Sequence, residues 1–230
     1  MHVTWIGGWG VAPESMRPLA EKHFAQSQHT FLPPTKQAME EILATGANSS
    51  STLSPSDKER TRVKGSPDLL VGWSFGAWRI LDAAARGATF PGMVLLFAPF
   101  VAFPSEAALG GKCSATQVKF LRRWLQREPL AAIADFCKRA DILAPPTPAE
   151  SAPPYALPDL LEGLDHLSEN ATPALQEFAA RGLPRNWQAF VGDRDPLLDG
   201  AKVCRSLPGC VLLRGVGHAI ADLLAATEAK

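Results

Sequence analysis

The chain has 230 residues, 46% of them hydrophobic, which fits one domain with a sizeable core or a domain with one insertion. Lys plus Arg and Asp plus Glu each number 23, and a net charge of zero argues against a general role in binding nucleic acids or membrane surfaces. No run of about 18 apolar residues occurs, so we expect no membrane span.

The four cysteines are scattered and form no CxxC pair. The N-terminal MHVTWIGG enters a strand-like segment at once, so we expect no secretion leader. We therefore predict a cytoplasmic protein with four free thiols.

Short apolar runs and helical spacing predict alternating strands and helices. The predicted strands cover residues 3–6, 29–32, 68–72, 93–99, 187–192 and 210–215. The predicted helices cover residues 36–45, 75–86, 115–140, 158–181 and 219–228. Residues 46–62 are polar and rich in Ser, and we interpret them as a solvated loop without an assigned function.

This alternation predicts an α/β fold with a mainly parallel sheet and helices on both faces. No strand-like run interrupts residues 105–183, which we interpret as a small helical lid. The core then consists of residues 1–104 and 184–230.

The spacing Gly72-Trp73-Ser74-Phe75-Gly76 matches G-x-S-x-G between a predicted strand and a predicted helix. A serine at such a turn is held in a strained geometry, and small neighbours let the strand and helix pack closely. We predict Ser74 to be a nucleophile. A helix-capping serine in a glycine turn is the simpler alternative for the motif alone.

A serine hydroxyl needs a base to take its proton, and His218 fits because it follows the last predicted strand. Loops after parallel strands meet at one end of a sheet, where Ser74 also lies. Of the remaining histidines, we expect His2 to be structural and His23 and His29 to be exposed. We expect His166, in the predicted lid, to be exposed, with a place in the lining of a pocket as the alternative.

The acid that orients the base is expected just after residues 187–192, where Asp193 and Asp195 stand. We favour Asp195 and assign Asp193 to capping the turn, although either aspartate alone is more simply a turn residue. Serine, acid and histidine then follow in the chain order of an α/β-hydrolase triad.

Two backbone amides are expected to bind the oxyanion of the tetrahedral intermediate. The amide of Phe75 follows the nucleophile directly. The loop Gly7-Gly8-Trp9-Gly10 lets the backbone turn towards Ser74, and we predict that Trp9 supplies the second amide.

The sequence resembles the α/β-hydrolases, and within them the short form of the pimeloyl-[acyl-carrier protein] methyl ester esterases of biotin synthesis. The motifs that carry this resemblance are Gly8-Trp9-Gly10, Gly72 to Trp78, Gly192 to Asp195 and Gly217-His218. Two features depart from the common pattern: Gly7-Gly8 replaces His-Gly before the oxyanion tryptophan, and Pro33-Pro34 replaces a Gly-x-Gly-x-Ser turn.

The resemblance implies a methyl ester on a dicarboxylic acyl chain, carried by an acidic acyl carrier protein. Such a carrier would dock on basic residues of the predicted 115–140 helix: Lys119, Arg122, Arg123 and Arg127. An ordinary solvated helix face is the alternative. The acyl chain would lie in an apolar cleft that the aromatic residues near the strand ends could line: Trp9, Phe75, Phe97 and Phe100.

No metal or organic cofactor is required by this chemistry. A hydrolase of small esters, thioesters or carbon–carbon bonds would use the same triad. A catalytically silent hydrolase fold that binds a ligand or partner is the alternative from another class.

Overall fold

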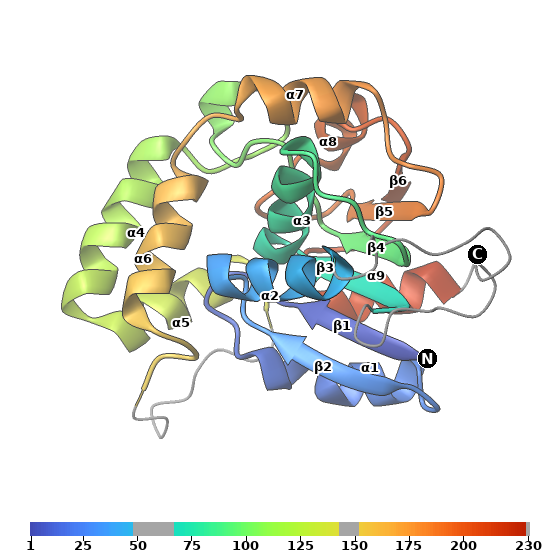
Figure 1. Ribbon diagram of the computed structural model, residues 1–230. Coiled ribbons are helices and arrows are strands. Elements are labelled where there is room, and N and C mark those ends of the chain that lie inside the picture. The colour runs from blue at the N-terminus through green and yellow to red at the C-terminus, as the bar shows by residue number, and fades with distance from the viewer. Residues whose placement is uncertain (48–66, 143–151, 229–230) are drawn as a thin grey trace, which may run out of the picture.

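The sheet of the computed structural model is parallel throughout, as predicted (Figure 1). The structure describes residues 1–47, 67–142 and 152–228, and within them six strands lie in the order β2-β1-β3-β4-β5-β6. The strands are β1 (His2–Ile6), β2 (Gln28–Leu32), β3 (Leu69–Trp73), β4 (Met93–Phe97), β5 (Trp187–Gly192) and β6 (Cys210–Leu213).

Helices cover both faces of the sheet. One face carries α1 (Arg17–His23) and α9 (Ile220–Glu228). A hydrogen bond between His23 Nδ1 and Glu228 Oε1, at 2.5 Å, joins these two helices. On the other face, α2 (Lys36–Ala47) contacts α3 (Phe75–Ala85). Burial from both sides explains why every residue of the central strand β3 is apolar or glycine.

Two short helices add to the predicted set, α1 and α8 (Gly200–Ser206). The side chain of Asp199 caps α8 by accepting a hydrogen bond from the Lys202 amide at 3.1 Å. Single turns of 3₁₀ helix cover Pro13–Met16 and Ser105–Ala107.

The prediction of one helix over 115–140 is wrong. Two helices occupy this range, α4 (Ala115–Arg127) and α5 (Pro129–Arg139). Proline disfavours the helical conformation in the residue before it, and Glu128 accordingly has φ −139° and ψ 72°.

The predicted 158–181 helix is divided in the same way, into α6 (Leu157–Leu167) and α7 (Pro173–Ala180). Thr172 caps α7 by accepting a hydrogen bond from the Leu175 amide at 3.2 Å. Both breaks follow from a proline that begins a new helix.

Helices α4, α5 and α6 pack beside the sheet, and we call these three the lid helices (Figure 1). Helix α7 lies against α3 instead. The division of the chain into a core and a separate 105–183 lid stays a prediction.

Residues 46–47 of the predicted polar loop complete α2, and residues 48–62 lie outside the described ranges. None of the helices in the described residues combines the length and apolar character that crossing a bilayer requires.

Candidate active site

Ser74 stands alone in the turn between β3 and α3, with φ 55° and ψ −118°. This backbone conformation is rare for a residue with a side chain and is maintained only by close packing. A Cβ at Gly76 would lie 2.3 Å from the carbonyl oxygen of Ile6, and one at Gly72 would lie 2.6 Å from Ile80 Cδ1. The two glycines therefore let α3 approach both its own strand and β1.

Ser74, His218 and Asp195 form a continuous hydrogen-bonded line. His218 Nε2 lies 2.9 Å from Ser74 Oγ, and His218 Nδ1 lies 2.6 Å from Asp195 Oδ2. A carboxylate can only accept, so Nδ1 carries a proton and Nε2 accepts the Ser74 hydroxyl. All three residues are buried, with exposed fractions of 6%, 1% and 0%.

The two candidate aspartates have different partners. Asp195 Oδ1 accepts hydrogen bonds from the amides of Leu197 and Leu198 at 2.8 and 2.9 Å, which leaves Oδ2 for the imidazole. Asp193 instead accepts from the Gly215 amide at 2.7 Å. The structure thus brings Asp195, and not Asp193, to His218.

The amides of Phe75 and Trp9 are placed in turns beside Ser74. Phe75 is the first residue of α3, where an amide has no partner within the helix. Among the described residues, no acceptor pairs with either amide. Both remain available to a developing negative charge, which the positive end of the α3 dipole also favours.

The lid helix α6 holds the loop that carries Trp9. The Trp9 indole nitrogen donates to the carbonyl oxygen of Leu160 at 2.9 Å. A Cβ at Gly163 would lie 2.8 Å from the Trp9 ring and 3.1 Å from the Phe75 ring, so the helix rests directly on both side chains. The position of α6 therefore determines the orientation of the two residues with free amides.

Trp73 has a role that the sequence does not reveal. Its indole nitrogen donates to the carbonyl oxygen of His218 at 2.9 Å, across 145 residues of chain. Trp78 stacks on Phe75, with ring centroids 5.4 Å apart. The tryptophan before Ser74 thus holds the loop of His218, and the later tryptophan supports Phe75.

A buried arginine joins the nucleophile helix to the lid. Arg79 is 7% exposed, lies 4.8 Å above the centre of the Phe75 ring and donates to Glu162 of α6. Glu162 also pairs with His166 at 3.0 Å. Burial raises the pKa of Glu162, but the hydrogen bond from His166 and the charge of Arg79 bring this pKa below its usual value.

The expected exposure of three histidines is corrected. His166 is in contact with Trp78, with ring centroids 5.2 Å apart. The His23 side chain is only 4% exposed, beside Glu228. His29 Nδ1 accepts from the Trp5 indole at 3.2 Å. His2 contacts Thr30 at 3.0 Å.

The predicted basic face is divided between ion pairs and exposed cations. Arg122 binds both carboxylate oxygens of Asp165 on α6, at 2.5 and 3.1 Å. Lys119, Arg123 and Arg127 are exposed on α4, beside Phe120 with an exposed fraction of 67%. Arg122 is therefore a link between two lid helices.

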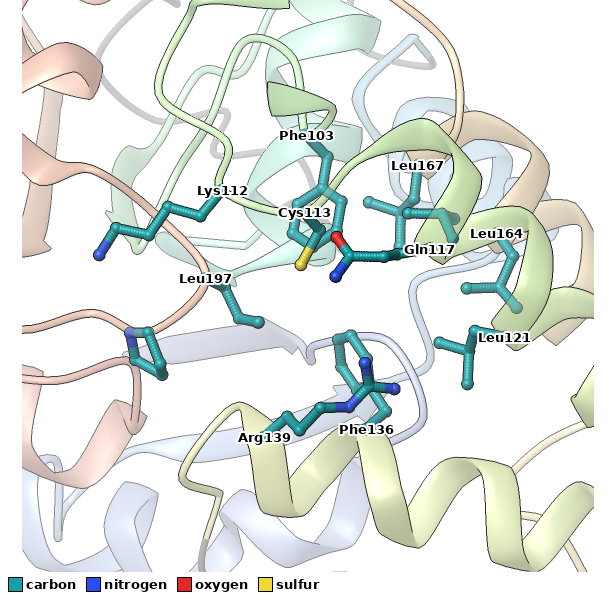
Figure 2. Close-up of a pocket in the computed structure, with 12 residues that line it drawn as sticks. Phe103, Lys112, Cys113, Gln117, Leu121, Phe136, Arg139, Leu164, Leu167 and Leu197 are labelled. Carbon is teal, nitrogen blue, oxygen red and sulfur yellow. The ribbon is translucent and has the colours of Figure 1, made fainter. Parts of the chain in front are cut away.

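A cavity of about 300 Å³ lies between the lid helices and the loops that follow β4 and β5 (Figure 2). Its apolar walls include Phe103, Phe136 and Leu197. None of the four aromatic residues predicted to line an apolar cleft belongs to it, because all four are buried: Trp9, Phe75, Phe97 and Phe100. The triad residues do not line it. It borders Asp195 through Leu197, whose amide donates to that carboxylate, and it borders Trp9 through Phe136, with ring centroids 4.9 Å apart.

The described residues contain free thiols but no cluster of metal ligands. No group of three or more His, Cys, Asp and Glu side chains is placed to hold a metal ion there. The four cysteines are free thiols, and burial raises the pKa of Cys137 to about 11.

No family model and no curated protein matches this sequence.

Solved structures do match along nearly the whole chain. An esterase from Rhodococcus sp. ECU1013 is 16% identical, with a TM-score of 0.60 over 100% of this chain and 88% of that one. An esterase from Exiguobacterium antarcticum is 10% identical, with a TM-score of 0.65 over 95% and 85% of the two chains. The fold is that of the α/β-hydrolases. A hydrolase from Pseudomonas aeruginosa PA01 shares this α/β-hydrolase fold at 12% identity, with a TM-score of 0.62 over 99% and 86%.

Proposed function

We propose that this protein is a serine hydrolase that cleaves carboxylic esters. The observation that carries the proposal is the hydrogen-bonded line from Ser74 through His218 to Asp195, which starts at a strained strand-to-helix turn. Two of the structures with this fold are named esterases.

The proposed reaction begins when Ser74 Oγ attacks the ester carbonyl and His218 Nε2 takes the hydroxyl proton. The amides of Trp9 and Phe75 stabilise the oxyanion, and Asp195 stabilises the imidazolium that has formed. His218 then protonates the leaving alkoxide. Water, activated by His218, hydrolyses the acyl-serine and regenerates the free hydroxyl.

Hydrolysis of p-nitrophenyl butyrate by the wild type and by Ser74→Ala tests this chemistry. We expect turnover in the wild type and a loss of at least about a thousandfold in the variant. Equal turnover by both proteins would overturn the assignment of Ser74. A wild type inert towards this ester and towards short acyl thioesters would support the silent, ligand-binding alternative.

A hydrolase of thioesters or of carbon–carbon bonds is the alternative on the same triad. Butyrylcholine and butyrylthiocholine form a matched pair that differs only in the atom that leaves. A kcat/KM at least about tenfold higher for the ester supports the esterase proposal, and the reverse ratio supports the thioesterase.

The narrower substrate is the methyl ester of a pimeloyl chain on an acyl carrier protein, hydrolysed in the cytoplasm during biotin synthesis. Two observations support this substrate. The Gly8-Trp9-Gly10 and Gly72 to Trp78 motifs resemble those of the pimeloyl-[acyl-carrier protein] methyl ester esterases, and α4 carries three exposed cations. An acidic carrier would be attracted by Lys119, Arg123 and Arg127.

The carrier proposal is tested with methyl pimeloyl-carrier protein and with the same acyl group on pantetheine alone. Lys119→Glu together with Arg123→Glu should lower kcat/KM for the carrier substrate about tenfold or more and leave the pantetheine substrate unchanged. Lys202→Glu on α8 serves as the matched control. Equal kcat/KM for both substrates in the wild type would contradict docking of the carrier.

A further inference from the structure

The polar residues of the lid cavity lie at its outer side. Lys112, Gln117 and Arg139 are all exposed, whereas Phe103, Phe136 and Leu197 are buried. The cavity therefore has an apolar inner part, which borders the triad and Trp9, and a polar mouth.

The mouth offers donors and no carboxylate. Gln117 Oε1 is engaged by the Ser114 amide at 2.7 Å in the capping box of α4. This bond fixes which end of the amide is the nitrogen, and Figure 2 shows that nitrogen turned into the cavity. No Asp or Glu of the described residues lines the cavity.

Arg139 provides the positive charge. Figure 2 shows its side chain on the α5 side of the cavity, across from Gln117. One of its nitrogens pairs with Asp135 at 2.6 Å, and a guanidinium has five N–H donors, so others remain for a ligand. Lys112 is directed to the side, where its ammonium donates to the backbone oxygen of Asp195.

We infer that this cavity binds the part of the substrate remote from the ester, and that this part is an apolar chain ending in a free carboxylate. The inference rests on the proposed ester hydrolysis at the neighbouring Ser74, and it is an alternative to the carrier-bound substrate, whose acyl chain ends in a thioester and has no free carboxylate. A volume of about 300 Å³ holds on the order of ten non-hydrogen atoms, since a water molecule occupies about 30 Å³. An ester at Ser74 would have its chain against the apolar walls and its carboxylate at Arg139 and Gln117, close to water.

The test compares mono-p-nitrophenyl suberate with p-nitrophenyl octanoate, which has the same chain length and no carboxylate. We expect the wild type to prefer the suberate ester. Arg139→Gln should lower this preference about tenfold, chiefly by raising KM for the acidic ester, because it removes a charge-assisted hydrogen bond. Lys138→Gln, an exposed cation of the same helix outside the cavity, should leave the preference unchanged. Arg139→Lys should restore part of it.

Calorimetric titration of Ser74→Ala with suberate and with octanoate provides a measurement that needs no catalysis. We expect suberate to bind more tightly, and the advantage to disappear in Ser74→Ala/Arg139→Gln. No preference for the acidic ester or ligand, or equal effects of Arg139→Gln and Lys138→Gln, would overturn the inference. Arg139-dependent binding of suberate without hydrolysis of either ester would support the cavity site and overturn the proposed esterase.

Discussion

The indole nitrogen of Trp73 donates a hydrogen bond to the backbone oxygen of His218 at 2.9 Å. The residue before the proposed nucleophile therefore holds the loop that carries the proposed base. Trp73 is buried, and its ring also lies 6.0 Å from the imidazole. The indole thus helps to hold His218 in place beside Ser74.

Trp73→Phe should keep the fold and lower kcat about tenfold or more, because a base displaced by a fraction of an ångström transfers the proton less well. KM should change little, since Trp73 does not line the cavity. Steady-state kinetics on p-nitrophenyl butyrate measure both parameters. Trp187→Phe, at a buried tryptophan that begins β5, is the matched control. An equal fall in kcat for both variants would contradict a specific role for Trp73.

The two aspartates of the Asp193–Asp195 turn provide a second test. Asp195→Asn should lower kcat by about a thousandfold or more, because an amide cannot stabilise the imidazolium and can present a donor to Nδ1. Asp193→Asn, which alters the bond from the Gly215 amide and the exposed ion pair with Arg214, should retain activity within a few-fold. Similar losses in the two variants would remove Asp195 from the triad.

Much of the site is predictable from the sequence because its determinants are local. The G-x-S-x-G spacing identifies the turn at Ser74, and the rule that parallel strands end at one edge brings His218 and the Asp193–Asp195 turn to the same place. The choice between the two aspartates has a local basis as well. It depends on the Leu197 and Leu198 amides, which hold Asp195 in the imidazole's direction.

The contacts between α3 and the lid helix α6 could not be predicted from the sequence, because they join residues that are far apart in the chain. Arg79 and Glu162 are 83 residues apart, and a charged residue four positions after Phe75 gives no sign that the lid will bury it. In contrast, the breaks at Pro129 and Pro173 have a visible signal, because a proline inside a long predicted helix favours a new helix start.

Gly76→Ala should lower the free energy of unfolding by about 3 kcal/mol, the upper end of the usual cost of overpacking. The added Cβ would meet the Ile6 carbonyl oxygen at 2.3 Å, and backbone cannot move aside easily. Gly7→Ala is the control, since its Cβ would meet only the flexible end of Met16 at 3.3 Å. Urea unfolding measures both. Equal losses would show that close approach of α3 to β1 is not the reason for glycine at position 76.

The ion pair between Arg79 and Glu162 should make the contact between α3 and α6 sensitive to acid. Because the pKa of Glu162 is lower in the folded protein than its usual 4.5, its contribution to stability is present above about pH 4.5 and is lost as the pH falls through the lowered value. Glu162→Gln should therefore lower Tm at neutral pH, and its Tm should approach that of the wild type in acid. Thermal unfolding of both proteins, measured at pH values between about 3 and 7 in steps of about one unit, gives this difference in Tm. Glu21→Gln, an exposed residue 3.8 Å from Arg17, is the control. A Tm difference that does not vary with pH would contradict the role of the ionised pair.

The most direct test of the central claim is covalent labelling with a fluorophosphonate, because this reagent reacts with an activated serine and requires no knowledge of the substrate. The account predicts one adduct per folded wild-type chain, located on Ser74 by peptide mass spectrometry, and no adduct on heat-denatured protein or on Ser74→Ala. An unlabelled wild type, or labelling that persists in Ser74→Ala, would contradict it.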